Sequence, residues 1–578
     1  MRKVFQSVKD VAVFLAWGIL SLLLVVLWSG TITAEDKQSL TIAGVSREEA
    51  LRQGERMYRD GILPSGEPLQ AVLEGEIPVD GRMFSCVSCH QRSGMGSLEG
   101  TVYTFPIDGP RLYKPMSMMG DLSKSAREKL PKMLLSGDFR PAYTDETLAV
   151  ALRAGEDPNG RKLNGVMPRY FLDDHDMEIM IFYLKNLTAE MPPGVTDTTI
   201  HLATVVTEEV KKEDRESMVA PLQFYARTWG KSRHAARRAK TGPFTEEVMD
   251  KGFRGLTLDV WELKGPREGW RKQLEEYYQK KPVFALVGGI TTGDWAPIHE
   301  FSEEHRIPNF FPVTDFPLIS DTEWYTLYFS KGLYQEGEAV ARYLHSIEEN
   351  LAPDLSVVQV FRNDRSGVTL ARAFRETREN LGQPLPIDVM LSNGEIVNGD
   401  FWKQLVGRHK NSILVLWLSP KDLSAIGGLV DVQDRPGMVF VSSGILGQDL
   451  YSLPEKVRSF VYVTYPYRLP QEGKGLKDGV KAWIRNNKLP VSNIDIGYKM
   501  YDIVRMLSEQ LGMLKGYYYR DRLLELIDMM PDQSYDVVLY PRLSFGPGQR
   551  YASKGCYIVQ LTEGPHPELV KRSEWVIH

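Results

Sequence analysis

The chain has very little cysteine. Its 578 residues include only Cys86, Cys89 and Cys556, so a framework of disulfides does not hold the protein together. The net charge of −5 at pH 7 is small for this length, which gives no reason to expect nucleic acid or an anionic membrane surface as a partner. The sequence also lacks internal repeats, low-complexity tracts, a P-loop, a Ser-His-Asp arrangement and any specific pair of carboxylates. Most signatures of a defined enzyme class are therefore missing.

Two of the three cysteines stand in the run Cys86-Val-Ser-Cys89-His90. C-x-x-C-H is the attachment signature of a c-type haem. Two thiols about one helical turn apart can both add to the vinyl groups of one porphyrin, and the following histidine can supply a neutral imidazole as the proximal iron ligand. A zinc half-site or a thioredoxin-like pair has the same spacing, but no second Cys/His pair at finger spacing and no βαβ pattern accompanies it. The sequence predicts one covalently bound haem c.

The N-terminus is basic and then apolar. Arg2 and Lys3 precede an apolar run from Val11 to Trp28, and the small residue Ala34 follows. This order is typical of an export signal, and the run is also long enough to span a bilayer. Residues 1–35 are therefore expected to be either a cleaved signal peptide or an N-terminal membrane anchor. Both place the bulk of the chain in the periplasm, where c-type haem is attached.

The length of the chain predicts more than one domain. Residues 45–58 have the periodicity of an amphipathic helix, and residues 176–187 form a second helical pattern after loops rich in glycine and proline. The run Pro192-Pro193-Gly194 then marks a boundary. We expect a first domain over residues 36–190 and a linker over residues 191–199.

The first domain resembles the monohaem cytochrome c family, which is all-α. The matching features are the helix before C-x-x-C-H, the Gly160-Arg161 stretch, the Met167-Pro168 loop and the closing helix through Tyr183–Leu187. The resemblance covers the whole domain, although the segment between the haem signature and Met167 is longer and richer in methionine than in the smallest members.

The resemblance implies that the two cysteines are thioether anchors and that His90 and Met167 are the axial iron ligands. A proline carbonyl, of Pro106 or Pro110, is expected to accept the Nδ1 proton of His90. His/Met ligation favours a relatively high potential and leaves no open iron position, which indicates electron relay rather than haem catalysis. Other residues could supply the second ligand instead: Met95, Met116, Met118, Met119, Met133 or His175.

From residue 200 onward, short apolar runs alternate with amphipathic stretches. Val283–Val287, Val357–Phe361 and Ile413–Leu418 are continuous apolar runs between helical patterns. Such runs indicate parallel strands that are covered on both faces. Residues 200–578 are too many for one sheet of this kind, so we expect two α/β lobes.

This second domain resembles the type I periplasmic solute-binding family, in its branched-chain-amino-acid-receptor branch. The matching segments are Phe284–Thr292, Ile307–Thr314, Tyr334–Leu344, Gly497–Leu507 and Tyr540–Arg550. The resemblance implies two lobes joined by hinge strands, with ligand in the cleft between them. Members that bind α-amino acids place an acidic residue near the position of Leu333-Tyr334. None is evident here, although Glu336 is close, and this speaks against an amino-acid ligand.

Ligands in open α/β sheets bind beyond the carboxyl ends of the strands. By that rule, the expected cleft residues are Thr291, Thr292, Thr314, Tyr334, Trp417 and Ser442. Hydroxyl and backbone N–H groups there could hold a carboxylate or another polar group, and Trp417 could cover an apolar part. Each of these residues could equally be an ordinary turn residue.

We therefore expect a periplasmic electron-transfer protein, in which a one-haem relay is coupled to a solute- or partner-binding domain. Its redox partner would be a periplasmic dehydrogenase or another cytochrome. The alternative is a solute receptor of the ABC-transporter substrate-binding type with the haem as a redox sensor, and a third hypothesis is an enzyme that oxidises a cleft-bound substrate. The basic stretch Lys231–Lys240 would be a solvated face or a docking site for an acidic redox partner.

Overall fold

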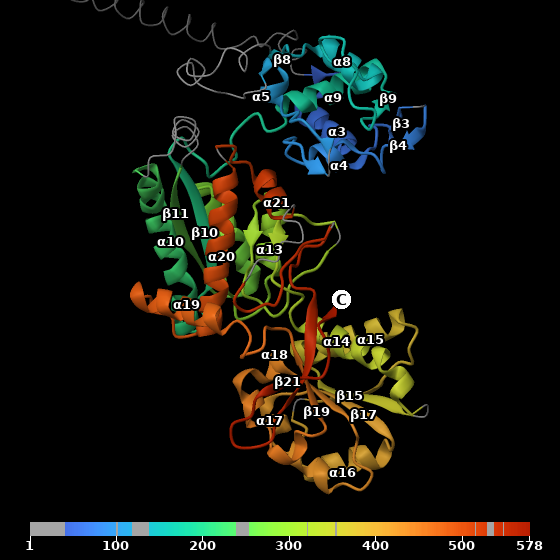
Figure 1. The fold of residues 1–578 in the computed structure, drawn as a ribbon, viewed down its shortest axis with the longest axis vertical. Helices are drawn as coiled ribbons and strands as arrows, with labels where there is room; N and C mark the ends of the chain where they lie inside the picture. Colours follow the sequence, from blue (N-terminus) through green and yellow to red (C-terminus); the bar gives the residue numbers. More distant parts are fainter. Residues whose placement is uncertain are drawn as a thin grey trace, which may run out of the picture. The chain divides into compact units, whose positions relative to one another are not determined.

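The computed structural model (Figure 1) describes residues 41–74, 76–99, 102–117, 138–238, 254–320, 322–352, 355–392, 394–514, 516–528, 537–546 and 548–577. The chain forms two compact units, Met1–Glu190 and Met191–His578. The expected signal or anchor, residues 1–35, lies outside the described residues. No helix within the described ranges is both long and apolar enough to cross a membrane.

The first unit combines helices with short antiparallel strands. The helices are α3 (Arg47–Asp60), α4 (Cys86–His90), α5 (Gly109–Leu112), α8 (Asp145–Ala154) and α9 (Asp174–Asn186). The strand pairings are β1 (Thr41–Ile42) with β2 (Val45–Ser46), β4 (Pro78–Asp80) with β3 (Gln70–Val72) and β9 (Arg169–Tyr170), β5 (Leu98–Glu99) with β6 (Val102–Tyr103), and β7 (Met116–Ser117) with β8 (Asp138–Arg140). The expectation of an all-α unit is corrected by these strands, which are too short to leave a periodic signal in the sequence.

Helices α3 and α9 cross at Gly54. A Cβ atom on Gly54 would lie 2.4 Å from Cβ of Tyr183, so the close approach of the two helices requires glycine. Next to the crossing, the buried rings of Tyr58 and Tyr183 meet with centroids 5.4 Å apart. The Tyr58 hydroxyl donates to the carbonyl oxygen of Gln91 at 2.7 Å. The crossing therefore fixes the chain directly after the haem signature.

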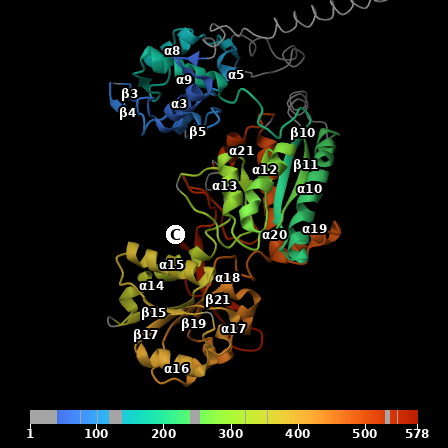
Figure 2. The same ribbon diagram turned by 180° about the vertical axis from the view of Figure 1, so that it is seen from behind.

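The second unit contains two α/β lobes, as expected. The first lobe has a parallel sheet in the order β11-β10-β12-β13-β14. Its strands are β10 (Thr199–Thr207), β11 (Gly255–Leu263), β12 (Ala285–Val287), β13 (Asn309–Phe310) and β14 (Thr326–Leu327). Its helices are α10 (Lys212–Arg238), α12 (Trp270–Lys280), α13 (Ala296–Glu304), α19 (Lys474–Asn486), α20 (Ile494–Met513) and α21 (Arg520–Asp528). Helices α10 and α20 cover one face of the sheet, and α12 and α13 cover the other (Figure 2).

The second lobe has a sheet in the order β16-β15-β17-β18-β19-β20-β21. The parallel strands are β15 (Ser356–Arg362), β16 (Ile387–Leu391), β17 (Ser412–Trp417), β18 (Val439–Ser442) and β19 (Val461–Tyr465), and the antiparallel ones are β20 (Gly555–Leu561), β21 (Leu569–Lys571) and β22 (Val576–Ile577). Its helices are α14 (Leu333–Ser346), α15 (Arg365–Asn380), α16 (Gly399–Arg408), α17 (Pro420–Leu423) and α18 (Ser443–Leu446). The expected buried strand residue Cys556 lies in β20.

Three connections join the lobes. The chain passes from β14 to α14, returns from β19 to α19, and passes again from α21 to β20. The first and third connections run side by side, because Tyr328 forms a parallel bridge with Tyr551. The backbone N–H of Ala552 also donates to the carbonyl oxygen of Tyr328 at 3.1 Å. Three passages between the lobes are what the sequence resemblance implies, and their action as hinges stays a prediction.

Candidate functional site

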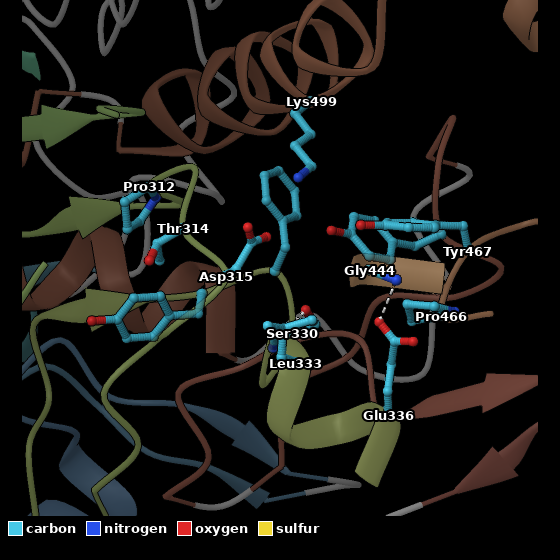
Figure 3. Close-up of a pocket in the computed structure, with 14 residues that line it drawn as sticks. Pro312, Thr314, Asp315, Ser330, Leu333, Glu336, Gly444, Pro466, Tyr467 and Lys499 are labelled. Carbon is cyan, nitrogen blue, oxygen red and sulfur yellow. Dashed lines mark hydrogen bonds between the residues drawn. The ribbon is translucent and has the colours of Figure 1, made fainter. Parts of the chain in front are cut away.

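A pocket lies where the three connections meet (Figure 3). Both lobes and all three connections contribute to its lining: Pro312, Thr314, Asp315, Tyr328, Phe329, Ser330, Gly332, Leu333, Glu336, Gly444, Pro466, Tyr467, Lys499 and Tyr540. A molecule bound here would contact both lobes and all three connections.

Glu336 is a fully buried acid in the first turn of α14. Its Oε1 accepts the backbone N–H of Gly444 at 3.0 Å, and its carboxyl group also accepts from the hydroxyls of Thr464 and Ser442. Burial raises the pKa of Glu336 to about 7, against the opposing effect of these donors. The group is therefore part acid and part carboxylate at neutral pH, and its partners all belong to the second lobe.

Lys499 brings a positive charge from α20 of the first lobe. Its ammonium group points into the pocket on the side of Asp315 (Figure 3). Burial lowers the pKa of Lys499, and the charges of Asp315 and Asp495 oppose that shift. Among the described residues, nothing donates to, accepts from or ion-pairs with this ammonium group. Lys499 is also the one basic residue among those that line the pocket.

Two tyrosines form a polar and aromatic wall. Burial raises the pKa of both Tyr467 and Tyr540 well above the usual value, so each phenol stays protonated and can donate a hydrogen bond. The Tyr540 hydroxyl is hydrogen-bonded to Ser330. The ring of Tyr540 lies 5.7 Å from that of Tyr467 and stacks on Phe329 with centroids 5.3 Å apart. The wall can therefore cover an apolar surface while it offers hydroxyl donors.

Three of the six expected cleft residues lie in or beside this pocket. Thr314 lines it, and its Oγ1 accepts the backbone N–H of Phe316 at 3.1 Å. Ser442 is buried behind it and contacts Glu336. Tyr334 lines a neighbouring groove, where its hydroxyl donates to the carboxylate of Glu376.

The other three expected residues line neither cavity. The hydroxyl of Thr291 donates to the carbonyl oxygen of Gly293, and that of Thr292 donates to Glu209. Trp417 is 1 % exposed and its Nε1 donates to Gln359 at 3.2 Å. The expectation that Trp417 covers a ligand is corrected by this position, because its ring packs in the core beneath α14 and α15.

The sequence did not predict Lys499, Tyr467 or Tyr540 as pocket residues, and Glu336 was noted only as close to the position of an expected acid. One signal was present for the lysine. Ile496 and Ile503 on the same helix are buried, and Lys499 lies three and four residues from them, on the same apolar stripe. A basic residue in such a stripe indicates either a buried ion pair or a ligand contact.

The C-x-x-C-H run folds as helix α4, and a hydrogen bond holds the His90 ring at its end. Nδ1 of His90 lies 3.1 Å from the carbonyl oxygen of Phe105. A carbonyl oxygen only accepts, so Nδ1 carries the proton and the lone pair of Nε2 is left for a metal. Burial lowers the pKa of His90 to about 4, which keeps the ring neutral at physiological pH. The prediction of Pro106 or Pro110 as the acceptor is wrong, since the preceding residue takes that role.

The predicted second ligand, Met167, is half-buried and packs against the core of the first unit. Among its rivals, Met95 has its sulfur engaged by the Arg111 guanidinium at 2.7 Å. Met116 is half-buried like Met167. Three further rivals lie outside the described residues: Met118, Met119 and Met133. Met167 stays a prediction, with Met116 as its described competitor.

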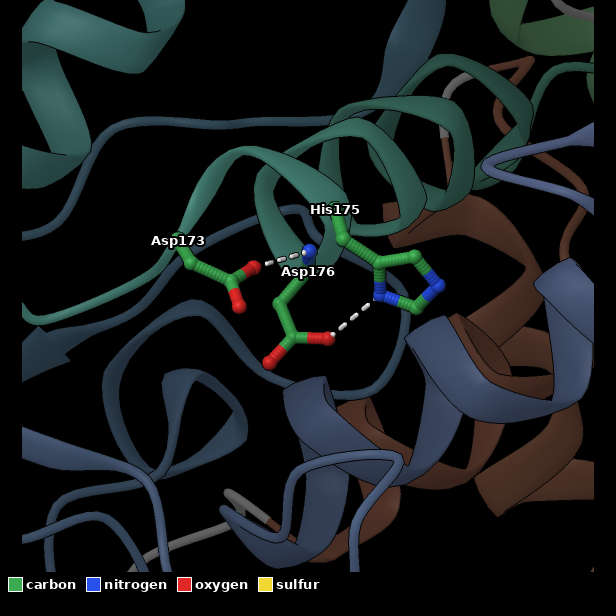
Figure 4. Close-up of side chains that lie close together, drawn as sticks. All are labelled: Asp173, His175 and Asp176. Atoms are coloured by element: carbon green, nitrogen blue, oxygen red, sulfur yellow. Dashed lines mark hydrogen bonds and ion pairs between the residues drawn. The ribbon is translucent and has the colours of Figure 1, made fainter.

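Asp173, His175 and Asp176 form a cluster at the start of α9 (Figure 4), with potential ligand atoms within 4.8 Å of one another. Asp173 caps the helix, because its carboxylate accepts the backbone N–H of Asp176 at 2.8 Å. Nδ1 of His175 lies 3.0 Å from Oδ1 of Asp176, and this hydrogen bond raises the pKa of the imidazole. Helix capping and one surface ion pair account for these contacts, and His175 is exposed to solvent.

The residues of the first unit fit a covalent haem c. Cys86 and Cys89 stand one turn apart on α4, and a neutral imidazole with an open Nε2 follows them. Phe105, which holds His90, is 42 % exposed, and Val166, beside Met167, is 51 % exposed. Apolar surface of this kind beside His90 and Met167 would suit contact with a porphyrin.

No protein-family model and no curated protein matches the chain. Solved structures with a similar fold include a fatty acid ABC transporter substrate-binding protein from Thermomonospora curvata (14% identity, 67% of this chain and 95% of that chain covered, TM-score 0.44). An ABC transporter substrate-binding protein from Sphaerobacter thermophilus has 12% identity over 66% of this chain and 98% of that chain, with a TM-score of 0.47. A branched-chain amino acid ABC transporter periplasmic ligand-binding protein from Burkholderia xenovorans has 11% identity over 65% of this chain and 95% of that chain, with a TM-score of 0.47. The two-lobed assignment of the second unit rests on its own sheet order.

Proposed function

We propose that the chain is an exported solute receptor. Its second unit binds a small polar molecule in the pocket where the three connections meet, which we call the hinge pocket. Its first unit carries one covalent haem c. The observation that carries the proposal is the pocket itself, which draws residues from both lobes and from all three connections. The N-terminal export pattern and the haem signature together support a periplasmic location. A membrane transporter or a signalling protein would be the partner that reads the bound state.

The pocket couples binding to lobe closure. A solute that contacts Lys499 is held by the first lobe, and one that reaches Gly444 and its neighbours is held by the second. Both sets of contacts are complete only when the lobes are closed, so binding favours the closed arrangement by the difference in affinity between the two states.

A thermal-shift screen of small metabolites on the full chain tests the receptor function. A ligand at a hundred times its dissociation constant should stabilise the second unit by about 2.7 kcal/mol. Hydrogen–deuterium exchange of the connections, at residues 328–332 and 466–470, should slow in its presence. A ligand that stabilises the unit without slowing exchange in the connections would contradict binding at the hinge.

Electron transfer by the first unit is the second candidate function, and the hydrogen bond from His90 to Phe105 favours it. When bound, a haem with His/Met ligation exchanges single electrons and leaves no iron position for a substrate. Cys86, Cys89, His90 and Met167 are the residues that would hold it.

Optical spectroscopy tests this second candidate. The dithionite-reduced protein should give a low-spin c-type spectrum, and Met167→Ala should lose the weak sulfur-to-iron band of the oxidised form. An unchanged band would exclude Met167 as the ligand, and the same experiment on Met116→Ala then tests its competitor. Carbon monoxide binding to the reduced wild-type protein would favour a catalytic haem instead.

A further inference from the structure

Resting on the proposed solute-binding function, we infer that the hinge pocket selects a small organic acid, bound as its anion with the carboxylate on the Lys499 ammonium group. The chemical class follows from how far each charged group of the pocket is buried and from which of them already have partners.

Among the described residues, neither the Lys499 ammonium group nor the Asp315 carboxylate has a hydrogen bond or an ion pair, and Lys499 is the more buried of the two. The Lys499 side chain is half-buried, and no described residue pairs with its ammonium group. Leaving a desolvated charge without a partner is unfavourable. A ligand carboxylate at this position would supply the missing counter-charge, and the phenols of Tyr467 and Tyr540 lie in the same lining as neutral donors. These groups together favour an anion.

The two acids of the pocket are poor sites for a cationic ligand. Glu336 already accepts from Gly444, Thr464 and Ser442, so its lone pairs are largely used. Asp315 lines the pocket and is exposed to solvent, so water screens an ion pair with it. An ammonium group would therefore find one saturated acid and one solvated acid, while a carboxylate finds a half-buried cation.

The position of Lys499 also gives the anion a mechanical role. The lysine belongs to α20 of the first lobe, whereas Glu336 and Gly444 belong to the second. A carboxylate anchored on Lys499 directs the rest of the molecule toward the second lobe. The charge would thus fix the ligand to one lobe, and its uncharged part would recognise the other.

Isothermal titration of the full chain with matched probes tests the inference. The probes are straight-chain and 2-hydroxy carboxylates of three to eight carbons, the amide of each, and the corresponding α-amino acids and primary amines. We expect at least one carboxylate to bind, its amide to bind at least 100-fold more weakly, and Lys499→Met to weaken the carboxylate at least 100-fold. Lys481→Met, which removes an exposed lysine from α19, should leave affinity unchanged.

The outcomes separate this inference from the proposed function. Tight binding of an amide or amine with no carboxylate preference would overturn the anion assignment and leave the receptor function standing. Carboxylate binding that Lys499→Met does not weaken would also overturn it. If no probe of any class binds, the receptor function itself fails. A thermal melt of Lys499→Met controls for folding, because loss of an unpaired charge should not lower its melting temperature.

Discussion

Replacing Glu336 by glutamine should make the second unit less sensitive to pH. The carboxyl group is fully buried, and burial raises its pKa from 4.5 to about 7. The folded state therefore binds a proton more tightly than the unfolded state does. By linkage, the stability from this group is fully present below pH 4.5 and is lost as pH rises through 7. The loss amounts to about 3 kcal/mol, since each pKa unit corresponds to about 1.36 kcal/mol.

Glutamine keeps the shape and removes the titration. Its carbonyl oxygen can still accept the backbone N–H of Gly444, and its amide can donate to the hydroxyl of Thr464. Glu336→Gln should therefore match the wild type near pH 5 and exceed it by up to about 3 kcal/mol at pH 8. Other titrating groups affect both proteins alike, so the difference between them isolates this one.

Urea unfolding at pH 5 and pH 8, followed by tryptophan fluorescence, is the assay. The signal reports the second unit, because residues 41–190 contain no tryptophan and Trp17 and Trp28 fall in the predicted export segment. Glu300→Gln, at an exposed site on α13, is the matched control and should follow the wild type at both values. A variant that tracks the wild type between pH 5 and 8 would refute the reasoning on burial.

Three further changes have direct readouts. Gly54→Val should destabilise the first unit by about 1–3 kcal/mol in circular-dichroism melts, because its Cβ overlaps Tyr183; unaltered melting would disprove the tight crossing. Arg365→Ala removes a half-exposed ion pair to Asp294 between the lobes, worth at most about 1 kcal/mol, and should speed hydrogen exchange in the connections; no change would show that the pair is not a clasp. Cys86→Ser should leave haem partly extractable by acidified acetone, whereas fully retained haem would contradict its role as an anchor.

The long apolar runs made the second unit predictable. Strands β15 and β17 are buried on both faces, and their apolar runs leave an unambiguous signal. The strands of two or three residues in the first unit leave none. The crossing of α3 and α9 at Gly54 could not be predicted either, because a single glycine in a helix does not show which residue packs against it.

The sequence did not predict most of the residues that line the pocket, for a different reason. The rule that ligands lie beyond strand ends led to Trp417, the last residue of β17. The two-residue alternation of a strand decides which face a side chain joins, and Trp417 shares with Ile413 and Val415 the face that packs under α14 and α15. Strand ends therefore mark the right edge of the sheet but do not tell which side chains open into the cleft.

The hinge pocket is assembled from segments that are far apart in the sequence. Asp315, Glu336, Tyr467, Lys499 and Tyr540 come from different elements, and only the three connections between the lobes bring them to one place. Each segment alone has an ordinary local explanation: a loop, a helix start, a turn after a strand or a polar residue in a helix. What distinguishes them is that a half-buried ammonium group and a saturated buried acid face the same space from opposite lobes. A receptor that closes on its ligand needs binding groups on both lobes, because one lobe binds the ligand first and the other contacts it when the lobes close.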